Sequence, residues 1–304
     1  MTTGLVVMAY GTPASPDDVE AYYTHIRRGR PPTPEQLRDL VDRYAAIGGV
    51  SPLARRTRDQ AAAIAAALAA EEPGAWRVEL GNKHAPPFLE DAVAAVVAGD
   101  PRPDRVVGLV LAPHYSRASV GEYHERAGAA AAERGVPYVR VDSWHDLPAW
   151  VDAQARRVRE ALAGLPAASR VLFTAHSLPE RVLAGDPYVD QLRDSAAAIA
   201  ARAGLAADRW ALAWQSAGRT PEPWRGPDVL DVLRDLGATP GVEGVLVCPQ
   251  GFVSDHLEVL HDLDIEARRV AEEVGLAFAR TASINDDPEV MPALARLVRA
   301  AAAG

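Results

Sequence analysis

The most reactive candidate side chain in this sequence is His176, which ends an apolar segment. Residues 171–180 read VLFTAHSLPE, a run of β-branched and aliphatic residues that stops at Ala175-His176-Ser177. Parallel α/β sheets present reactive side chains at the carboxyl ends of such strands. An imidazole in that position can accept a proton or bind a metal ion near neutral pH.

A second chemical signal is an acidic segment, GFVSDHLEVLHDLDIE, which follows another apolar run. It places Asp255, Glu258, Asp262 and Glu266 at helical spacing. The last three are four residues apart, so a regular α-helix would carry them on one face. Ionised carboxylates in a row repel one another and favour bound cations or shared protons. A solvated acidic surface is the alternative, but together with the histidine the segment predicts a proton-and-metal site.

A third signal is an arginine-rich segment that also contains several tyrosines. Guanidinium groups pair with carboxylates and phosphates, and aromatic rings pack on flat ligands. The segment therefore indicates an aromatic ligand with acidic groups, with a solvated basic helix face as the alternative. The residues concerned are Arg27, Arg28, Arg30, Arg43, Tyr22, Tyr23 and Tyr44.

Tyr10 follows the first predicted strand, in MAYGTP. That segment lacks both GxGxxG and GxxxxGK[ST], so a phosphate-binding loop is not expected there. The phenol of Tyr10 is then either a packing group with one hydrogen bond or a residue that faces a ligand at the strand edge.

The composition limits the class of protein. The chain has 304 residues, of which 48% are hydrophobic and 24% charged, as in soluble proteins with two domains. A net charge of −9 argues against nucleic acid as a partner. We expect no membrane span, because the sequence contains no apolar run of eighteen residues. The single cysteine, Cys248, excludes an intrachain disulfide and a four-cysteine metal cluster, and we expect a cytoplasmic protein.

Strand-length apolar runs alternate with longer stretches of helical period, which is typical of parallel βαβ units. The pattern predicts an α/β fold of two doubly wound Rossmann-like domains, each with a four-stranded parallel sheet, and an active-site cleft between them. We expect domains at 1–145 and 146–287, with a last helix at about 288–304 that packs back on the first domain. The predicted strands are 4–10, 76–81, 104–114, 137–143, 169–176, 209–216, 242–249 and 276–282.

A series of motifs relates the chain to a known family. HSLPE at 176–180 and GFVSDHLE at 251–258 are the most specific in combination. Together with the segments listed next, they resemble the ferrochelatases, which insert Fe(II) into a porphyrin, and most of all the short bacterial type that acts on coproporphyrin III. These segments are the Tyr10 region, HIRRGRPPTPE, RYAAIGGVSPL, GNKHAPPFLEDAV, LAPHYSRASVGEY and WQSAGRTPEPWRGPDVLDVL.

The resemblance implies a chelatase-type fold and a role for each matching residue. His176 matches the metal-site histidine, Glu258 its partner carboxylate, and Tyr10 the tyrosine that faces the iron from the other side. The acidic row matches Asp262 and Glu266, which allows an accessory divalent cation such as Mg²⁺; the histidine at 261 departs from an all-acidic row and would alter metal affinity there. The positions that match porphyrin contacts are Tyr10, Arg27, Arg43, Tyr44, Ser51 and Tyr123.

The resemblance also implies a metal-inserting lyase of haem biosynthesis, whose substrates are coproporphyrin III and Fe(II). The sequence shows neither a cysteine-rich extension nor a hydrophobic lip helix, so we expect no iron–sulfur cluster, no tightly bound cofactor and no integral membrane contact. We expect a monomer that makes transient contacts with neighbouring haem-pathway enzymes. The alternatives are a protoporphyrin IX ferrochelatase, a cobalt or sirohydrochlorin chelatase, and a porphyrin- or haem-binding carrier without turnover.

Overall fold

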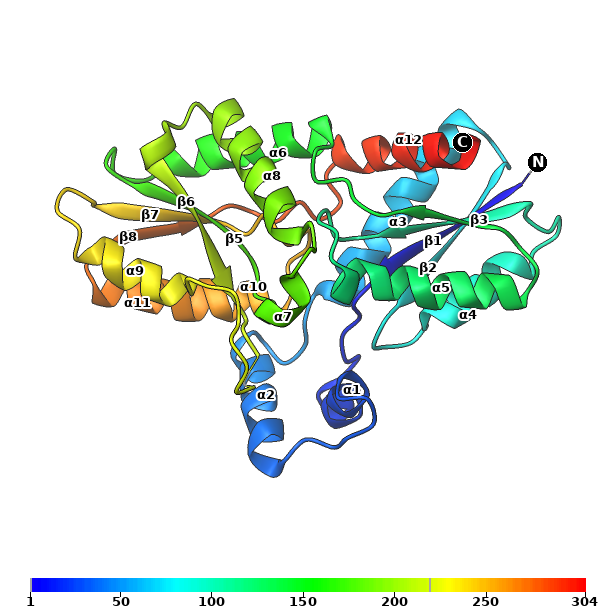
Figure 1. Ribbon diagram of the computed structural model, residues 1–304, viewed down its shortest axis with the longest axis horizontal. Coiled ribbons are helices and arrows are strands. Elements are labelled where there is room, and N and C mark those ends of the chain that lie inside the picture. Colours follow the sequence, from blue (N-terminus) through cyan, green and yellow to red (C-terminus); the bar gives the residue numbers. More distant parts are fainter. Residues whose placement is uncertain (1, 219) are drawn as a thin grey trace.

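The computed structural model describes residues 2–218 and 220–304, which contain two four-stranded parallel sheets (Figure 1). The two sheets have equivalent strand orders, β2-β1-β3-β4 and β6-β5-β7-β8. All eight predicted strands are present, and the predicted α/β fold class is confirmed. The first sheet contains β1 (Thr3–Ala9), β2 (Trp76–Asn82), β3 (Arg105–Val110) and β4 (Tyr138–Val141), and the second contains β5 (Arg170–His176), β6 (Trp210–Gln215), β7 (Gly244–Cys248) and β8 (Ala277–Arg280).

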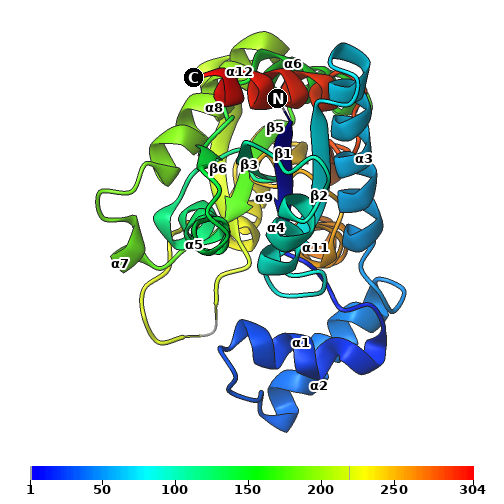
Figure 2. The same cartoon turned by 90° about the vertical axis from the view of Figure 1, so that its right-hand side faces the viewer.

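Helices cover both faces of each sheet (Figures 1 and 2). On the first sheet, α3 (Leu53–Glu71) and α12 (Val290–Ala303) lie on one face, and α4 (Leu89–Val97) and α5 (Glu122–Glu133) on the other. On the second sheet, α6 (Pro148–Leu162) and α8 (Tyr188–Ala203) lie opposite α9 (Val229–Gly237) and α11 (Arg268–Glu273). Shorter elements in the connections include η1 (Pro16–Asp18), η2 (Arg117–Gly121), α7 (Glu180–Leu183) and η3 (Ala207–Arg209).

The C-terminal helix α12 joins the two halves. It follows the second sheet in the chain but packs against α3, β3 and β4 of the first half. One apolar core cluster contains Leu5 and Leu109 of the first sheet, Val171 and Phe173 of the second, and Leu294 of α12. The halves therefore share a core, and the domain limits at 145 and 287 stay a prediction.

Two helices project from the body on the side of the carboxyl ends of the strands (Figures 1 and 2). They are α1 (Val19–Ile26) and α2 (Pro34–Ala46). A capping box starts α2, because the Thr33 hydroxyl accepts from the Gln36 N–H and the Gln36 side chain accepts from the Thr33 N–H. After α2, Gly48 and Gly49 have φ of 101° and 98°, and these left-handed conformations turn the chain toward α3.

The acidic segment differs from the regular α-helix that its spacing predicted. It consists of α10 (Leu257–Leu260), the π-helical turn η4 (Asp262–Ala267) and then α11. In the π-helical turn the N–H of Glu266 bonds to the carbonyl oxygen of His261, five residues back. This wider turn places Glu266 beside His261, and Asp262 belongs to the same cluster, whereas Glu258 lines the cavity. The prediction of one continuous α-helical row from Glu258 to Glu266 is therefore wrong.

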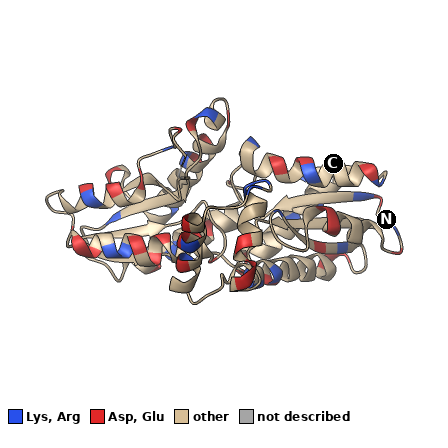
Figure 3. Cartoon of the chain, turned by 90° about the horizontal axis from the view of Figure 1, so that it is seen from below, with Lys and Arg blue, Asp and Glu red and all other residues tan. Residues whose placement is uncertain are grey.

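No helix among the described residues is long and apolar enough to span a bilayer. Seen from the side of α1 and α2, basic and acidic residues are interspersed along the helices of both halves (Figure 3).

A buried polar joint around Gln60 of α3 also connects the halves. The amide nitrogen of Gln60 donates to the carbonyl oxygens of Val253 and Asn285, at 3.3 and 3.0 Å, and its amide oxygen accepts from the Ser254 hydroxyl at 3.0 Å. Val253 and Ser254 belong to the loop that leads from β7 to Glu258. A helix of the first half therefore fixes a loop of the second.

Gln60→Leu should lower the free energy of unfolding by about 2–4 kcal/mol, because two carbonyl groups and a hydroxyl lose their buried partner. Urea unfolding measures the change. Arg58→Ala, at an exposed position of the same helix, is the control and should stay within about 0.5 kcal/mol of the parent. An unfolding midpoint for Gln60→Leu equal to that of the parent would contradict this role.

Candidate active site

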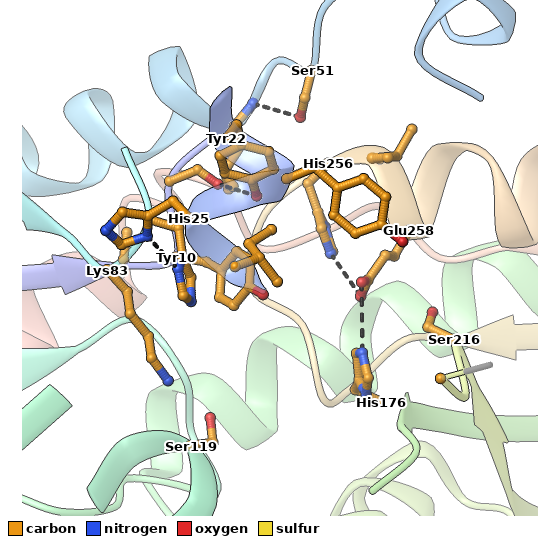
Figure 4. A pocket seen from close by; sticks show the side chains of 18 of the residues that line it. Tyr10, Tyr22, His25, Ser51, Lys83, Ser119, His176, Ser216, His256 and Glu258 are labelled. Carbon is orange, nitrogen blue, oxygen red and sulfur yellow. Dashed lines mark hydrogen bonds and ion pairs between the residues drawn. The ribbon is translucent and has the colours of Figure 1, made fainter. Parts of the chain in front are cut away.

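A cavity of about 1520 Å³ lies where the two halves meet (Figure 4). Its walls come from α1, α2 and the loops that follow β1, β2, β3, β5, β6 and β7. In each sheet the strand order reverses at a central strand: β2 and β3 lie on either side of β1 in the first half, and β6 and β7 lie on either side of β5 in the second. Doubly wound sheets bind ligands in the crevice at such reversals, and here both crevices open into one cavity.

His176 enters this cavity as the last residue of β5. Its Nε2 lies 3.5 Å from Oε1 of Glu258 (Figure 4), and its Nδ1 donates to the carbonyl oxygen of Ser177. The Tyr188 hydroxyl donates to the carbonyl oxygen of His176 at 3.2 Å and holds the strand end in place. These contacts direct Nε2 toward the carboxylate.

Glu258 lies in the first turn of α10, between two imidazoles (Figure 4). Its Oε2 is 3.7 Å from Nε2 of His256, and Nδ1 of His256 is 2.9 Å from the carbonyl oxygen of Ser254. The Gln215 amide donates to the backbone carbonyl of Glu258 at 3.0 Å. His256 was not predicted from the sequence, although its place two residues before Glu258 in SDHLE is a usable signal.

The pair of His176 and Glu258 is ionised at neutral pH. Burial opposes the charged imidazole, but the Glu258 carboxylate outweighs it and raises the pKa of His176 to about 9. Burial raises the pKa of Glu258, but the neighbouring His176 cation lowers it by more. The pKa of Glu258 therefore lies well below its usual range. With about a third of each side chain exposed, the pair is accessible from the cavity. A carboxylate and a deprotonated imidazole both suit Fe(II), so binding of that metal would release the proton that the pair holds.

Tyr10 projects from the opposite wall, with 43% of the residue exposed (Figure 4). Desolvation in the cavity wall, and next the charge of Glu258, raise the pKa of Tyr10, so the group is a neutral phenol. Its ring centroid lies 4.6 Å from that of His84, whose Nδ1 lies 3.0 Å from Nδ1 of His25. Burial, and then the charge of Lys83, lower the pKa of His84 to about 3. This imidazole pair was not predicted from the sequence, because its members are 59 residues apart.

The residues expected to contact the substrate all line the cavity: Arg27, Arg43, Tyr44, Ser51 and Tyr123. The hydroxyl of Tyr44 lies 3.3 Å from that of Thr12. Lys83 is a further cation of the wall that the sequence analysis did not select. It is buried, its Nζ lies 2.9 Å from Glu122 and 5.0 Å from the ring centroid of Tyr123, and burial lowers its pKa.

The remaining acids have other surroundings. Asp262 and Glu266 do not line the cavity; with His261 they form a cluster whose ligand atoms lie within 4.8 Å of one another. Asp255 accepts hydrogen bonds from Ser283 and Asn285, at 2.8 and 2.9 Å. Asp255 therefore supports the loop before α10 and does not join the acidic cluster.

Two doubly wound halves with a histidine–carboxylate pair in their shared cleft define a chelatase-type protein. A solved structure, SirB from Bacillus subtilis with Fe3+, has this fold, with a TM-score of 0.60, 14% identity and coverage of 100% of this chain and 96% of that chain. At the level of sequence, the family model described as Ferrochelatase matches residues 2–302, so the chain belongs to the ferrochelatase family.

Curated relatives cover nearly the whole chain. The coproporphyrin III ferrochelatase of Geobacillus kaustophilus is 48% identical, over 98% of this chain and 95% of the relative. The coproporphyrin III ferrochelatase of Bacillus subtilis is 45% identical, over 97% of this chain and 96% of the relative. The expected family is confirmed, and the match favours it over the sirohydrochlorin chelatase alternative.

Histidine NMR should show that His176 stays protonated at pH 7.5 and titrates near pH 9. Because that pKa exceeds the unfolded value of about 6.5, the His176 charge contributes stability below pH 6.5 that is lost as the pH rises through about 9. Glu258→Gln should bring the pKa of His176 to 6.5 or below, because burial then acts without the opposing carboxylate. An unchanged titration in this variant would mean that the pair is not formed in solution.

Proposed function

We propose that this protein inserts Fe(II) into coproporphyrin III and produces coprohaem as a step of haem biosynthesis. The observation that carries the proposal is the ionised pair of His176 and Glu258, which faces Tyr10 across a cavity of about 1520 Å³. This volume exceeds the range of about 300–1,000 Å³ typical of drug-sized ligands and suits a tetrapyrrole. The names of the curated relatives supply the substrate.

Insertion replaces two pyrrole N–H protons with one Fe(II), so two protons must leave the site. The nitrogens of a planar porphyrin point into the ring, and a cleft that bends the ring exposes their lone pairs on one face. In the proposed arrangement His176 and Glu258 bind iron and accept protons on that face. Since the pair already holds a proton at neutral pH, that proton leaves when Fe(II) binds. When the iron passes to the ring, the freed pair takes up one pyrrole proton and the second leaves to solvent, so two protons are released for each iron inserted. Tyr10 approaches the metal from the other face as a neutral oxygen donor.

Substrate choice is proposed to depend on carboxylates at the porphyrin edge. Coproporphyrin III carries four propionates and protoporphyrin IX carries two. Arg27, Arg43 and Lys83 are cations of the cavity wall, and Tyr44, Ser51 and Tyr123 add hydroxyl groups. Each well-formed contact of a propionate with a cation is worth roughly 1.5–3 kcal/mol, which favours the tetracarboxylate.

An anaerobic assay with Fe(II), read by loss of porphyrin fluorescence, tests the proposal. We expect turnover with a higher kcat/KM for coproporphyrin III than for protoporphyrin IX, and His176→Ala should lose at least about 100-fold in kcat while still binding porphyrin. Saturable binding without turnover in the parent would support the carrier alternative. Equal or higher kcat/KM for protoporphyrin IX would reverse the assignment of the substrate.

We further propose an accessory divalent cation, such as Mg²⁺, at His261, Asp262 and Glu266. In support, the ligand atoms of these residues lie within 4.8 Å of one another.

We propose no tightly bound cofactor and no iron–sulfur cluster: Cys248 is the chain's single cysteine, and burial raises its pKa to about 12. A monomer in the cytoplasm that makes transient contacts with neighbouring haem-pathway enzymes stays a prediction.

Glu266→Gln should reduce the stimulation of iron insertion by added Mg²⁺, because it removes one charged ligand and leaves the cavity lining intact. The measurement is the initial rate at limiting Fe(II) with and without Mg²⁺. Glu272→Gln, a nearby exposed change of the same type, is the control and should respond like the parent. If the stimulation in Glu266→Gln equals that of the parent, the cluster is surface charge only.

A further inference from the structure

Arg43 belongs to two sets of residues at once. It lines the cavity, and its Nη2 also donates to Oδ1 of Asp262 while its Nε donates to Nδ1 of His261 at 3.3 Å. Arg43 lies in α2 of the projecting helices, and its two partners lie at the start of η4, more than 200 residues later in the chain.

The partners of Arg43 lie behind the cavity wall. The Asp262 side chain is 8% exposed and does not line the cavity, whereas that of Arg43 is 26% exposed. The second carboxylate oxygen of Asp262 accepts from the hydroxyl of Ser216. Both oxygens of Asp262 therefore have donors, and one is the guanidinium that reaches the cavity.

The hydrogen bonds of Arg43 leave part of its guanidinium available. A guanidinium carries five N–H donors along two edges. The contacts with His261 and Asp262 use the edge formed by Nε and Nη2, and no hydrogen bond among the described residues uses Nη1. The edge formed by Nη1 and Nη2 can accept a carboxylate in the fork geometry without breaking the contact with Asp262.

We propose that Asp262, assisted by His261, is a positioning residue for porphyrin recognition: it holds Arg43 so that the free guanidinium edge meets a propionate of the substrate. This inference rests on the proposed function. The substrate does not take Arg43 away from Asp262, because the buried carboxylate would then keep only the Ser216 hydroxyl and a long contact of 3.4 Å with Nδ1 of His261. Without Asp262, the long side chain of Arg43 would have to be ordered by the ligand, which weakens binding.

The test is the Kd of coproporphyrin III, measured by fluorescence with a metal chelator present, so that neither iron insertion nor the accessory cation contributes. Asp262→Asn should raise the Kd by about fivefold or more. Asp42→Asn is the matched control and should leave the Kd unchanged, since Asp42 is exposed on the same helix and takes part in none of the described ion pairs. Asp42→Asn removes a negative charge next to Arg43 in the sequence, as Asp262→Asn removes one from its ion pair, but it leaves the hydrogen-bond partners of the Arg43 guanidinium in place.

A double-mutant cycle isolates the effect of Asp262 on Arg43. In an Arg43→Gln background, which has already lost most of the arginine contact, Asp262→Asn should cause no further loss. Arg43→Lys, which keeps the Asp262 side chain, should raise the Kd to a similar extent, because one ammonium cannot replace the two guanidinium edges.

Three results would overturn the positioning role: an unchanged Kd in Asp262→Asn, tighter binding, or an equal loss in the Arg43→Gln background. Tighter binding would mean that Asp262 competes with the propionate for Arg43. The parent enzyme separates this inference from the proposed function. If the parent inserts iron but these Kd values do not change as expected, only the positioning role fails; if the parent neither binds coproporphyrin III nor inserts iron, the proposed function fails.

Discussion

The ion pair between His176 and Glu258 is the interaction on which the rest of the site depends. A charged imidazole and a carboxylate in a partly desolvated cleft are each unfavourable alone and stabilise one another as a pair. Hydrogen bonds to neighbouring residues also fix the position of each member: His176 bonds to Ser177 and Tyr188, and the backbone of Glu258 bonds to Gln215. The pair holds a proton at neutral pH, so binding of a metal ion by these two side chains would release that proton.

The pair comes entirely from the second half of the chain, whereas Tyr10 and the arginines of the cavity come from the first. The distance between these groups is therefore set by the joint between the halves. A shared apolar core, the crossing of α12 and the amide of Gln60 form that joint. Because Gln60 contacts the loop that leads to Glu258, the packing of α3 and the position of the carboxylate are directly connected.

The acids near the cavity have separate surroundings although they are close in sequence. Glu258 pairs with His176, Asp255 supports its loop, Asp262 holds Arg43, and Glu266 lies beside His261. The π-helical turn causes part of this separation, because its extra residue per turn changes which side chains share a face. A local change in backbone hydrogen bonding thus accompanies the separation of Glu258, which lines the cavity, from the cluster of His261, Asp262 and Glu266.

Sequence by itself determined the strands, the two doubly wound halves and the family, and it selected His176 and Glu258 as a candidate pair. These features are carried by local periodicity and by short motifs at strand ends, where neighbouring residues are enough to indicate the structure. Only the tertiary structure decided that a π-helical turn interrupts the acidic helix and that Asp262 pairs with an arginine 219 residues away. The physical reason is that the spacing of residue types along the sequence does not reveal whether a backbone N–H donates to the carbonyl oxygen four or five residues earlier. Nor does it reveal which distant charge will lie beside a buried carboxylate once both halves have packed together.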